Sequence, residues 1–503
     1  MSSSRSGALK LPQVTTERLV AALVFLAIFA MASKPSMDTD TWWHLRTGQW
    51  ILEHGAVPRV DLFSYTRLGQ PWLIPGWLVQ APMAWLYRAL GPGGLNLWTA
   101  AMVTLAFVFI WRTLPGGVFL KAFVVVLAAA VSGVYWAARP YLVTFVLAAL
   151  FLRLLEAERW AAPDQAERAG RRLLWLPALM VIWANAHGGF AVGFILLGVY
   201  GLDRLARLVT GRLLGQRWPA GELRRLMWLA LSGLLMLGAV CLTPAGPQML
   251  LYPFKTVAIE ALQAYILEWQ SPNFHLPAAQ PLLLMLAALI AALGASRQRM
   301  ALSDFLLAAG FTCLALLAWR NVALFALAAP LVIARHAAPV LAEAGVRVGF
   351  SGASRTAGPR QARLNLALLV VFVLAVLVKA GSDFLPETNR KAMQPLVPVE
   401  AAAFIRREQP AGRLFNSYNW GAYLLWELPE YPVFIDGRTD LYNDAIIGEW
   451  LQVVRGEPGW QDTLDRWGVR LVLLEPSMPV TGLLEGHGWR LLYRDDQALV
   501  YAR

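Results

Sequence analysis

The chain has 503 residues, of which 57% are hydrophobic and only 15% are charged, and its mean hydropathy is +0.50. A water-soluble protein of this size cannot bury so many apolar side chains, so the composition excludes the soluble globular classes and indicates an integral membrane protein. The net charge of +12 does not indicate a nucleic-acid partner, because the basic residues stand in short segments between apolar runs.

Eleven apolar runs approach the length needed to cross about 30 Å of hydrocarbon, and they predict a polytopic α-helical bundle. The runs lie at residues 18–33, 94–112, 118–136, 141–157, 173–185, 189–204, 226–243, 279–295, 302–318, 322–335 and 364–380. If the N-terminus is cytoplasmic, the basic segments 158–172, 207–225, 297–299 and 347–363 all fall on the cytoplasmic side, as the positive-inside rule requires. The first run also resembles a signal peptide that ends at "AMAS", but we expect it to be retained as the first helix.

This topology makes residues 34–93 a long outer loop. The loop opens with "MDTDTWWHLRTGQWILEH", where Asp38 or Thr39 can cap a helix that runs to about His54. Its last part, "PGWLVQAPMAWLYRALG", is rich in proline and tryptophan, and we expect it to lie as a helix in the outer interface. If this helix were counted as a span, the basic segment 158–172 would lie outside, against the positive-inside rule, so we reject that alternative.

The composition becomes that of a soluble protein at about residue 381. We therefore divide the chain into a membrane module, residues 1–380, and an outer α/β domain, residues 381–503. Strands are predicted in "GRLFNSY", "YPVFIDGR" and "VRLVLLEP" and, as a hairpin, in "WRLLYRDDQALVYAR". Helices are predicted in "VEAAAFIRRE", "AIIGEWLQVVRG" and "GWQDTLDRW".

Polar residues in apolar surroundings concentrate on the outer side of this topology, at or near helix ends. An ionisable group at such a position is a candidate functional residue, although a cation there can also extend to the lipid headgroups. The candidates are Asp38, Asp40, His44, Arg139, His187, Lys255, Glu268 and Arg320.

Asp40 and His44 are four residues apart and share one face of the predicted helix. A carboxylate beside an imidazole can orient a proton acceptor, or it can hold a divalent cation such as Mg²⁺ or Mn²⁺. The sequence makes this pair the candidate metal ligands and leaves open whether any metal is bound.

Two further motifs are candidate ligand contacts. "NAHGGF" places His187 and two glycines at the outer end of a helix pair, where the glycines allow a tight turn or a close approach to a ligand. "FIDGRTDLY" places Asp436, Arg438 and Asp440 after a predicted strand, where ligands often bind to α/β sheets. Each motif also has a purely structural interpretation. The first can be a helical hairpin turn in which the backbone hydrogen-bonds His187, and the second can be an Asp-Gly turn with an Arg–Asp ion pair.

The first 90 residues resemble the GT-C membrane glycosyltransferases, through one span followed by an outer loop that opens with "MDTDTWWHLRTGQWILEHGAVP" and closes with "GQPWLIPGWLVQAPMAWLYRALG". Protein O-mannosyltransferases, lipid A aminoarabinose transferases and, more distantly, oligosaccharyltransferases belong to this superfamily. The segments "WANAHGGF", "ILEWQSPNF", "RNVALFALAAPL" and "VFIDGRTDLY" are similar to a bacterial group within it.

The resemblance implies a sugar donor linked to a polyprenyl phosphate or diphosphate, transfer with inversion, and an active-site acid at Asp38 or Asp40. Many members of the superfamily carry a second acid after the third span, but this chain has "ARPYLVT" there, with Arg139 and no carboxylate. That difference puts a two-acid or metal-bridged mechanism in doubt, and Glu268 is a candidate for the missing acid. The acceptor, a glycan, lipid or protein, is not indicated.

We therefore expect a glycosyltransferase of the cytoplasmic membrane. A carboxylate whose pKa is raised by partial burial would take the acceptor proton, and Arg139, Lys255 and Arg320 are candidate cations for the departing phosphate. A transporter or flippase would instead need ionisable groups or broken helices near the bilayer midplane, often with inverted repeats. A non-catalytic scaffold for envelope assembly would leave the acids of the outer loop as helix caps.

Overall fold

The computed structural model describes residues 14–215, 220–345 and 358–503. Parts of the basic segments 207–225 and 347–363 fall outside these ranges. Apolar runs form helices in a membrane because each backbone N–H and C=O group must be paired within its own segment. All eleven predicted runs lie in helical segments of the structure. The helices of the bundle are α1 Thr16–Ala32, α3 Trp77–Thr113, α4 Val118–Ser132, α5 Tyr141–Arg159, α6 Ala166–Arg172, α7 Trp175–Ala186, α8 Ala191–Leu213, α9 Ala220–Val240, α12 Gln280–Ala295, α13 Leu302–Phe305, α14 Phe311–Leu317, α15 Val322–Glu343 and α16 Pro359–Phe384.

Seven helical stretches within the described ranges are long and apolar enough to span a membrane. These stretches are Trp77–Thr113, Val118–Tyr135, Gly188–Leu213, Gly221–Val240, Pro277–Ala295, Trp319–Glu343 and Pro359–Phe384, and Leu302–Leu317 is a shorter apolar helix. The chain is therefore a membrane protein. The crossing of α1, α5 and α7, the choice of membrane and the orientation of the termini stay predictions.

Helix α3 joins two segments that the sequence presents as separate. It begins at Trp77, has a non-helical residue at Gly91 with φ of 63°, and continues to Thr113. A positive φ is open to glycine at little cost, so the chain can change direction there without a loop. The predicted interfacial helix and the predicted span are thus consecutive parts of one element.

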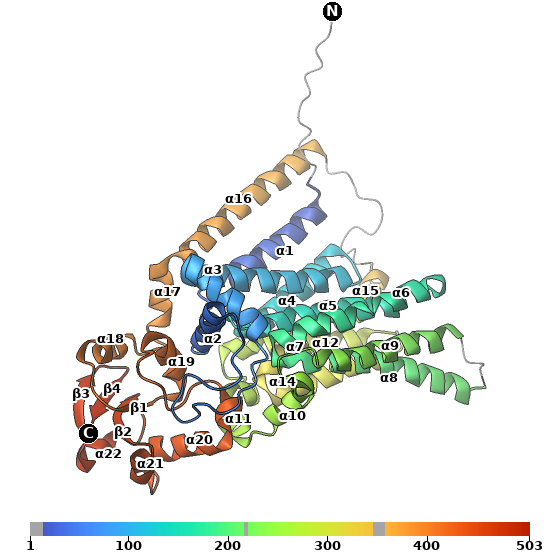
Figure 1. Cartoon of the computed structure of the whole chain (residues 1–503). Helices are drawn as coiled ribbons and strands as arrows, with labels where there is room; N and C mark the ends of the chain where they lie inside the picture. Colours follow the sequence, from blue (N-terminus) through green and yellow to red (C-terminus); the bar gives the residue numbers. More distant parts are fainter. Residues whose placement is uncertain (1–13, 216–219, 346–357) are drawn as a thin grey trace, which may run out of the picture.

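The C-terminal part is a small α/β domain at one end of the bundle (Figure 1). Its sheet has the order β1-β2-β4-β3, in which β1 and β2 are parallel and the other pairs are antiparallel. The strands are β1 Arg413–Asn416, β2 Val469–Leu474, β3 Arg490–Arg494 and β4 Leu499–Ala502. The helices are α17 Pro386–Met393, α18 Val399–Glu408, α19 Tyr418–Glu427, α20 Thr439–Val454, α21 Trp460–Arg466 and α22 Thr481–Leu484. The predicted hairpin and the three predicted helices are confirmed, and α17, α19 and α22 were not predicted.

The strand predicted in "YPVFIDGR" is wrong. Val433 makes one isolated bridge to Ser64, and the following backbone is held by a side chain. Asn416 Oδ1 accepts from the N–H of Phe434 at 2.8 Å, and Asn416 Nδ2 donates to the carbonyl of Ile435 at 2.8 Å. The apolar run is buried as expected, but an amide side chain takes the place of a neighbouring strand.

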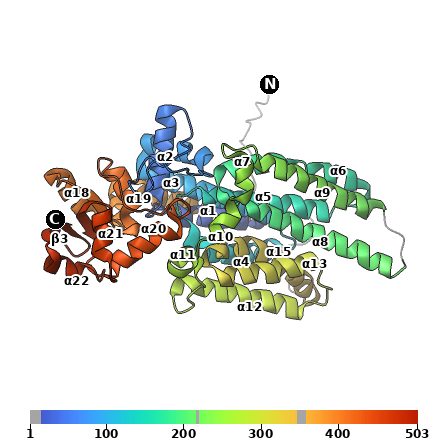
Figure 2. The same ribbon diagram turned by 60° about the horizontal axis from the view of Figure 1, so that its bottom comes forward.

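The first long loop packs with the C-terminal domain. Helix α2, Thr41–His54, lies between α3 and α19 (Figure 1). Trp42, Phe63 and Trp72 of the loop belong to the same hydrophobic core as Phe415 and Phe434 of the domain, and the bundle has a separate core. Helix α11, Glu260–Tyr265, lies beside α20 of the domain (Figure 2). The predicted boundary at residue 380 falls inside α16 and stays untested as a domain division.

Candidate functional site

The two acids before α2 have different surroundings. Asp38 Oδ1 accepts from the backbone N–H groups of Asp40 and Thr41 at 3.1 and 3.0 Å and from the Thr41 hydroxyl at 2.9 Å. Asp38 therefore caps the helix start, as the sequence allows. Asp40 occupies the position directly before the helix, but its side chain makes no capping hydrogen bond. Its carboxylate is thus available for another purpose.

Arg139 holds both acids and a third one. It lies between α4 and α5, where the N–H of Ala138 donates to the carbonyl of Ser36 at 2.7 Å and ties this turn to the first loop. Arg139 Nε lies 2.5 Å from Asp38 Oδ2, and Arg139 Nη1 lies 2.9 Å from Asp40 Oδ2 and 3.2 Å from Glu268 Oε1. We call these four residues the Arg139 cluster. Residues from three separate loops therefore meet on one guanidinium.

The Arg139 cluster combines three carboxylates with one guanidinium, and Asp40 is buried within it. Burial raises the pKa of Asp40 from 3.8 to about 7, against the opposing effect of Arg139, and the charges of Asp38 and Glu268 add to the rise. A quarter of the Asp40 side chain remains accessible. A carboxylate with such a pKa is suited to accept a proton near neutral pH.

Glu268 and Arg320 lie on adjacent turns. Glu268 is in the 3₁₀ turn Leu267–Trp269 and Arg320 in the 3₁₀ turn Trp319–Asn321, which are joined where Trp319 N–H donates to the Gln270 carbonyl at 2.8 Å. The guanidinium of Arg320 stacks 4.4 Å from the centre of the Trp269 ring. Within the described part of the chain it makes no ion pair or hydrogen bond. It is therefore a cation whose N–H groups remain open to a ligand.

Tyr135, near the end of α4, has a hydroxyl group in the same region. Tyr135 is 8% exposed, and among the described residues its hydroxyl has no hydrogen-bond partner. It lies within electrostatic reach of Glu268, Arg320 and Arg139. A buried hydroxyl without a partner is costly, and a ligand that accepts a hydrogen bond would compensate it. Sequence reasoning missed Tyr135, and its nearness to Arg139 in "VYWAAR" was the only signal.

The other predicted contacts, His44, His187 and Lys255, do not belong to the Arg139 cluster. His44 is buried against Trp43 and hydrogen-bonds Gln80 at 2.9 Å, and burial lowers its pKa well below the ordinary value. His187 Nδ1 accepts from Gly189 N–H at 3.0 Å and contacts the Thr144 hydroxyl at 2.8 Å, as a structural hairpin turn would require. Lys255 is exposed on α10, Tyr252–Val257.

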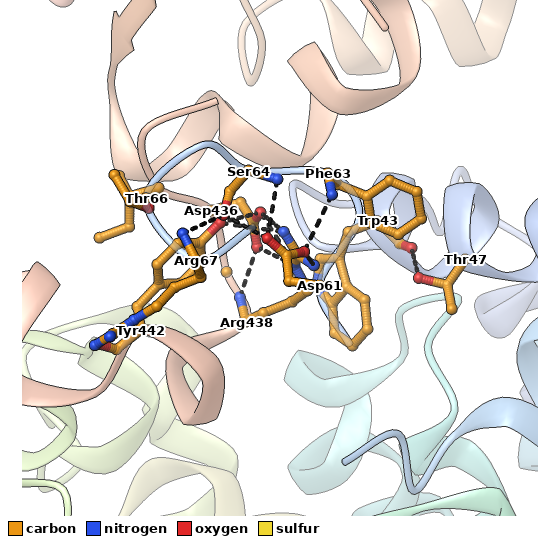
Figure 3. A network of polar contacts seen from close by, with 12 residues as sticks. Trp43, Thr47, Asp61, Phe63, Ser64, Thr66, Arg67, Asp436, Arg438 and Tyr442 are labelled. Carbon is orange, nitrogen blue, oxygen red and sulfur yellow. Dashed lines mark hydrogen bonds and ion pairs between the residues drawn. The ribbon is translucent and has the colours of Figure 1, made fainter. Parts of the chain in front are cut away.

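The three predicted residues of the C-terminal domain separate into two groups, and Figure 3 shows the first of them, Asp436 and Arg438, beside Asp61. Asp436 and Arg438 have no exposed side-chain surface, and Arg438 pairs with Asp436 at 2.6 Å and with Asp61 of the first loop at 2.5 Å. A ligand cannot reach these groups. They form a buried network of ion pairs that joins the C-terminal domain to the first loop. Asp440 is half-buried and accepts from the Tyr252 hydroxyl at 3.3 Å, and burial raises its pKa to about 6.

A divalent metal does not fit the residues present. Arg139 already occupies the position between the three carboxylates where a metal would have to lie. His44 does not turn toward Asp40 but bonds Gln80. No group of three or more His, Cys, Asp or Glu side chains in the described ranges is arranged to hold a metal ion. A cavity of about 600 Å³ lies elsewhere, beside Tyr65 and Arg413, and no member of the Arg139 cluster lines it.

Comparison with known proteins gives matches in structure only. No protein-family model matches the sequence, and no curated protein matches it. The structure of the archaeal oligosaccharyltransferase AglB from Archaeoglobus fulgidus, in complex with an inhibitory peptide and a dolichol-phosphate, matches with a TM-score of 0.53 at 10% identity. That match covers 96% of this chain and 74% of that chain.

ArnT from Cupriavidus metallidurans, bound to undecaprenyl phosphate, also matches with a TM-score of 0.53, at 16% identity, over 96% of this chain and 97% of that chain. An A. fulgidus oligosaccharyltransferase in complex with Zn and sulfate matches with a TM-score of 0.50, at 12% identity, over 96% of this chain and 73% of that chain. These proteins are GT-C glycosyltransferases. The resemblance seen in the first loop is therefore confirmed at the level of the fold: the chain has the fold of the GT-C membrane glycosyltransferases.

Proposed function

We propose that the protein is a membrane glycosyltransferase that moves a sugar from a polyprenyl-phosphate-linked donor to an acceptor hydroxyl or amine. The observation that carries the proposal is the Asp40 carboxylate, which is partly accessible, has a pKa of about 7 and is held by Arg139 at the loop end of a GT-C fold. Structures with the same fold contain dolichol-phosphate and undecaprenyl phosphate, which supports a lipid phosphate as the partner here. We assign this end to the outer face of the cytoplasmic membrane.

The transfer requires a base, and Asp40 has that role in our proposal. The acceptor O–H or N–H gives its proton to an Asp40 carboxylate oxygen while the acceptor atom forms a bond to the anomeric carbon of the sugar. The bond between that carbon and the phosphate oxygen breaks, and its electron pair leaves with the polyprenyl phosphate. Attack opposite to the leaving group would give inversion. Asp38 is a positioning residue for Arg139 because its acceptors are already in use.

The departing phosphate requires a cation that is not already paired with a carboxylate. This requirement distinguishes between the three candidate cations, Arg139, Lys255 and Arg320. Arg139 is neutralised by three carboxylates, and Lys255 is exposed on α10. Arg320 has open N–H groups and is stacked on Trp269 beside Glu268, with the Tyr135 hydroxyl in reach. Fixed donors that stabilise developing charge contribute strongly to catalysis. We therefore assign the departing phosphate to Arg320 and Tyr135.

The direct test is release of the lipid product, polyprenyl phosphate or polyprenyl diphosphate, from a panel of sugars linked to polyprenyl phosphate or polyprenyl diphosphate. The purified protein is compared with its Asp40→Asn and Asp38→Asn variants after each is shown to be folded. Turnover with one donor class, lost in Asp40→Asn, supports the proposal. No turnover with any donor, or equal turnover in all three proteins, would refute it and return transport or scaffolding to consideration.

A further inference from the structure

Gly437 of the C-terminal domain lies directly against the candidate base. A Cβ atom at this position would stand 1.9 Å from Asp40 Oδ1 and 2.8 Å from Asp40 Cγ, well inside van der Waals contact. The φ angle of Gly437 is outside the left-handed region, so other residues can adopt its backbone conformation. A residue with a Cβ at this position would therefore require the carboxylate of Asp40 to move.

Arg438, which follows Gly437, is anchored in the first loop (Figure 3). Arg438 Nη1 pairs with Asp61 Oδ1 at 2.5 Å, and Asp61 Oδ2 in turn accepts from Ser64 N–H at 3.0 Å. Asp436 Oδ1 accepts from the backbone N–H of Arg438 at 2.9 Å and so closes a tight turn around the glycine. The Gly437 peptide cannot move far from Asp40 without breaking a fully buried ion network.

Thr439 and Tyr418 of the C-terminal domain extend the contact region around Gly437. The hydroxyl groups of Thr439 and Tyr418 are 2.9 Å apart and hydrogen-bonded. Burial raises the pKa of Tyr418, and the nearby Asp40 carboxylate adds to that rise, which agrees with its position beside the base. Asp40 thus has Arg139 of the membrane bundle at Oδ2 and the C-terminal domain at Oδ1.

We propose that Gly437 and Arg438 are positioning residues for Asp40, so that the C-terminal domain completes the catalytic site of the membrane bundle. This inference rests on the proposed function for its catalytic part. The buried network holds the domain against the first loop, and the glycine fits the surface of the carboxylate. Together they exclude water from one side of Asp40 and set the direction of the oxygen that receives the proton.

The test is Gly437→Ala, with Gly448→Ala as the matched control. Both substitutions add one methyl group to the same domain, but a Cβ at position 448 would meet no heavy atom within 4 Å. We expect Gly437→Ala to displace the carboxylate and lower kcat by roughly 10- to 100-fold, because a small misplacement of a reacting group is costly. The KM for the donor should change less than about twofold, since the phosphate contacts are elsewhere. Gly448→Ala should match the wild type.

A second measurement does not depend on transfer. Carbodiimides activate protonated carboxyl groups, so the rate at which Asp40 is labelled, read by mass spectrometry of its peptide, reports the surroundings of this one side chain. We expect the rate to change clearly in Gly437→Ala and not in Gly448→Ala. If the wild type releases no polyprenyl phosphate from any donor, the proposed function fails, and the labelling alone decides whether Gly437 positions Asp40.

Other outcomes would overturn the inference. Wild-type labelling of Asp40 in Gly437→Ala would show that the glycine does not position the carboxylate, whatever happens to turnover. Altered labelling with unchanged kcat would show that the contact has no role in catalysis. If Gly437→Ala does not fold, Arg438→Lys replaces it in the same two measurements, because lysine keeps the charge but cannot reproduce the paired contacts of the guanidinium.

Discussion

Asp38 and Asp40 share the guanidinium of Arg139, at 2.5 Å from its Nε and 2.9 Å from its Nη1 respectively. Asp38 also accepts three hydrogen bonds at the start of α2, whereas Asp40 makes none of these capping contacts. Two acids that are two positions apart in the sequence therefore have separable structural roles. Substituting each in turn should affect stability and turnover differently.

Asp40→Asn should remove turnover and leave folding intact. Asparagine has nearly the same shape but cannot accept the acceptor proton, so kcat should fall roughly 100-fold or more. Asp38→Ala should instead lower stability by about 1 kcal/mol, because alanine removes the oxygen that accepts hydrogen bonds at the start of α2. The measurements are release of polyprenyl phosphate and thermal unfolding in detergent. Equal loss of stability in both variants would contradict this division of roles.

The pH dependence of turnover should follow the Asp40 carboxyl. Its pKa of about 7 means that the base form is in the minority below pH 7, so kcat/KM should rise with pH and level off above about 8. The charged or titratable groups that act on it are Asp38, Arg139, Glu268 and, from the C-terminal domain, Asp436 and Tyr418. Replacing Glu268 with glutamine removes a repelling charge, and the midpoint should move to lower pH. A pH profile without a midpoint between 6 and 8 would count against Asp40 as the base.

The Asp40 carboxyl should also make the folding stability depend on pH, but this contribution should fall as the pH rises, whereas turnover should increase. The folded protein binds the Asp40 proton more tightly than the unfolded chain does, because the pKa is raised from 3.8 to about 7. This contribution to stability is complete below the unfolded pKa and is lost as the pH rises through the folded pKa. Asp40→Asn should therefore gain stability relative to the wild type as the pH is raised from 5 to 8. Thermal unfolding of both proteins across this range measures the difference.

Arg320→Ala should weaken the use of the donor far more than Lys255→Ala. The open guanidinium of Arg320 is held by Trp269 beside the cluster, whereas Lys255 is exposed on α10. We expect kcat/KM to fall roughly 100-fold for Arg320→Ala, in the range seen when a fixed donor is removed from a transition state. Lys255→Ala should change it less than about threefold. If kcat/KM fell more in Lys255→Ala than in Arg320→Ala, the phosphate contact would have to be assigned to Lys255 instead of Arg320.

Arg438→Met should destabilise the protein strongly. It leaves Asp61 and Asp436 buried without a counter-charge, which typically costs about 3 to 5 kcal/mol. The control is Arg455→Met, because Arg455 pairs with Glu457 at an exposed site, where an ion pair contributes little to stability. Thermal unfolding of the two variants should separate them clearly. Similar melting temperatures would show that the buried network is dispensable.

The orientation of the chain can be tested with reporters. The basic segments between the helices predict that the C-terminal domain lies outside the cytoplasm. An alkaline phosphatase fused after Arg503 should be active, and a fluorescent protein that folds only in the cytoplasm should remain dark at that position. The opposite pattern would overturn the orientation and with it the assigned face of the site.

The sequence predicted the helices of the bundle because long apolar runs have few other structures available in a membrane. It also predicted Asp40, Arg139 and Glu268 as candidates, although only the fold shows that they meet. The strand at "YPVFIDGR" was predicted wrongly, because a buried apolar run has the same composition whether its backbone pairs with a strand or with the side chain of Asn416. Tyr135 was missed because an unpartnered hydroxyl is visible only in three dimensions.

The core shared by the first loop and the C-terminal domain has a consequence for biosynthesis. Asp61 and its partner Arg438 are 377 residues apart, so the loop emerges from the ribosome long before the domain that covers it. At a typical synthesis rate, the delay is roughly 20 to 75 s. During that time the aromatic rings of Trp42, Phe63 and Trp72 have no core to enter. The nascent protein should therefore depend on a chaperone or on the membrane surface to shield this loop until translation ends.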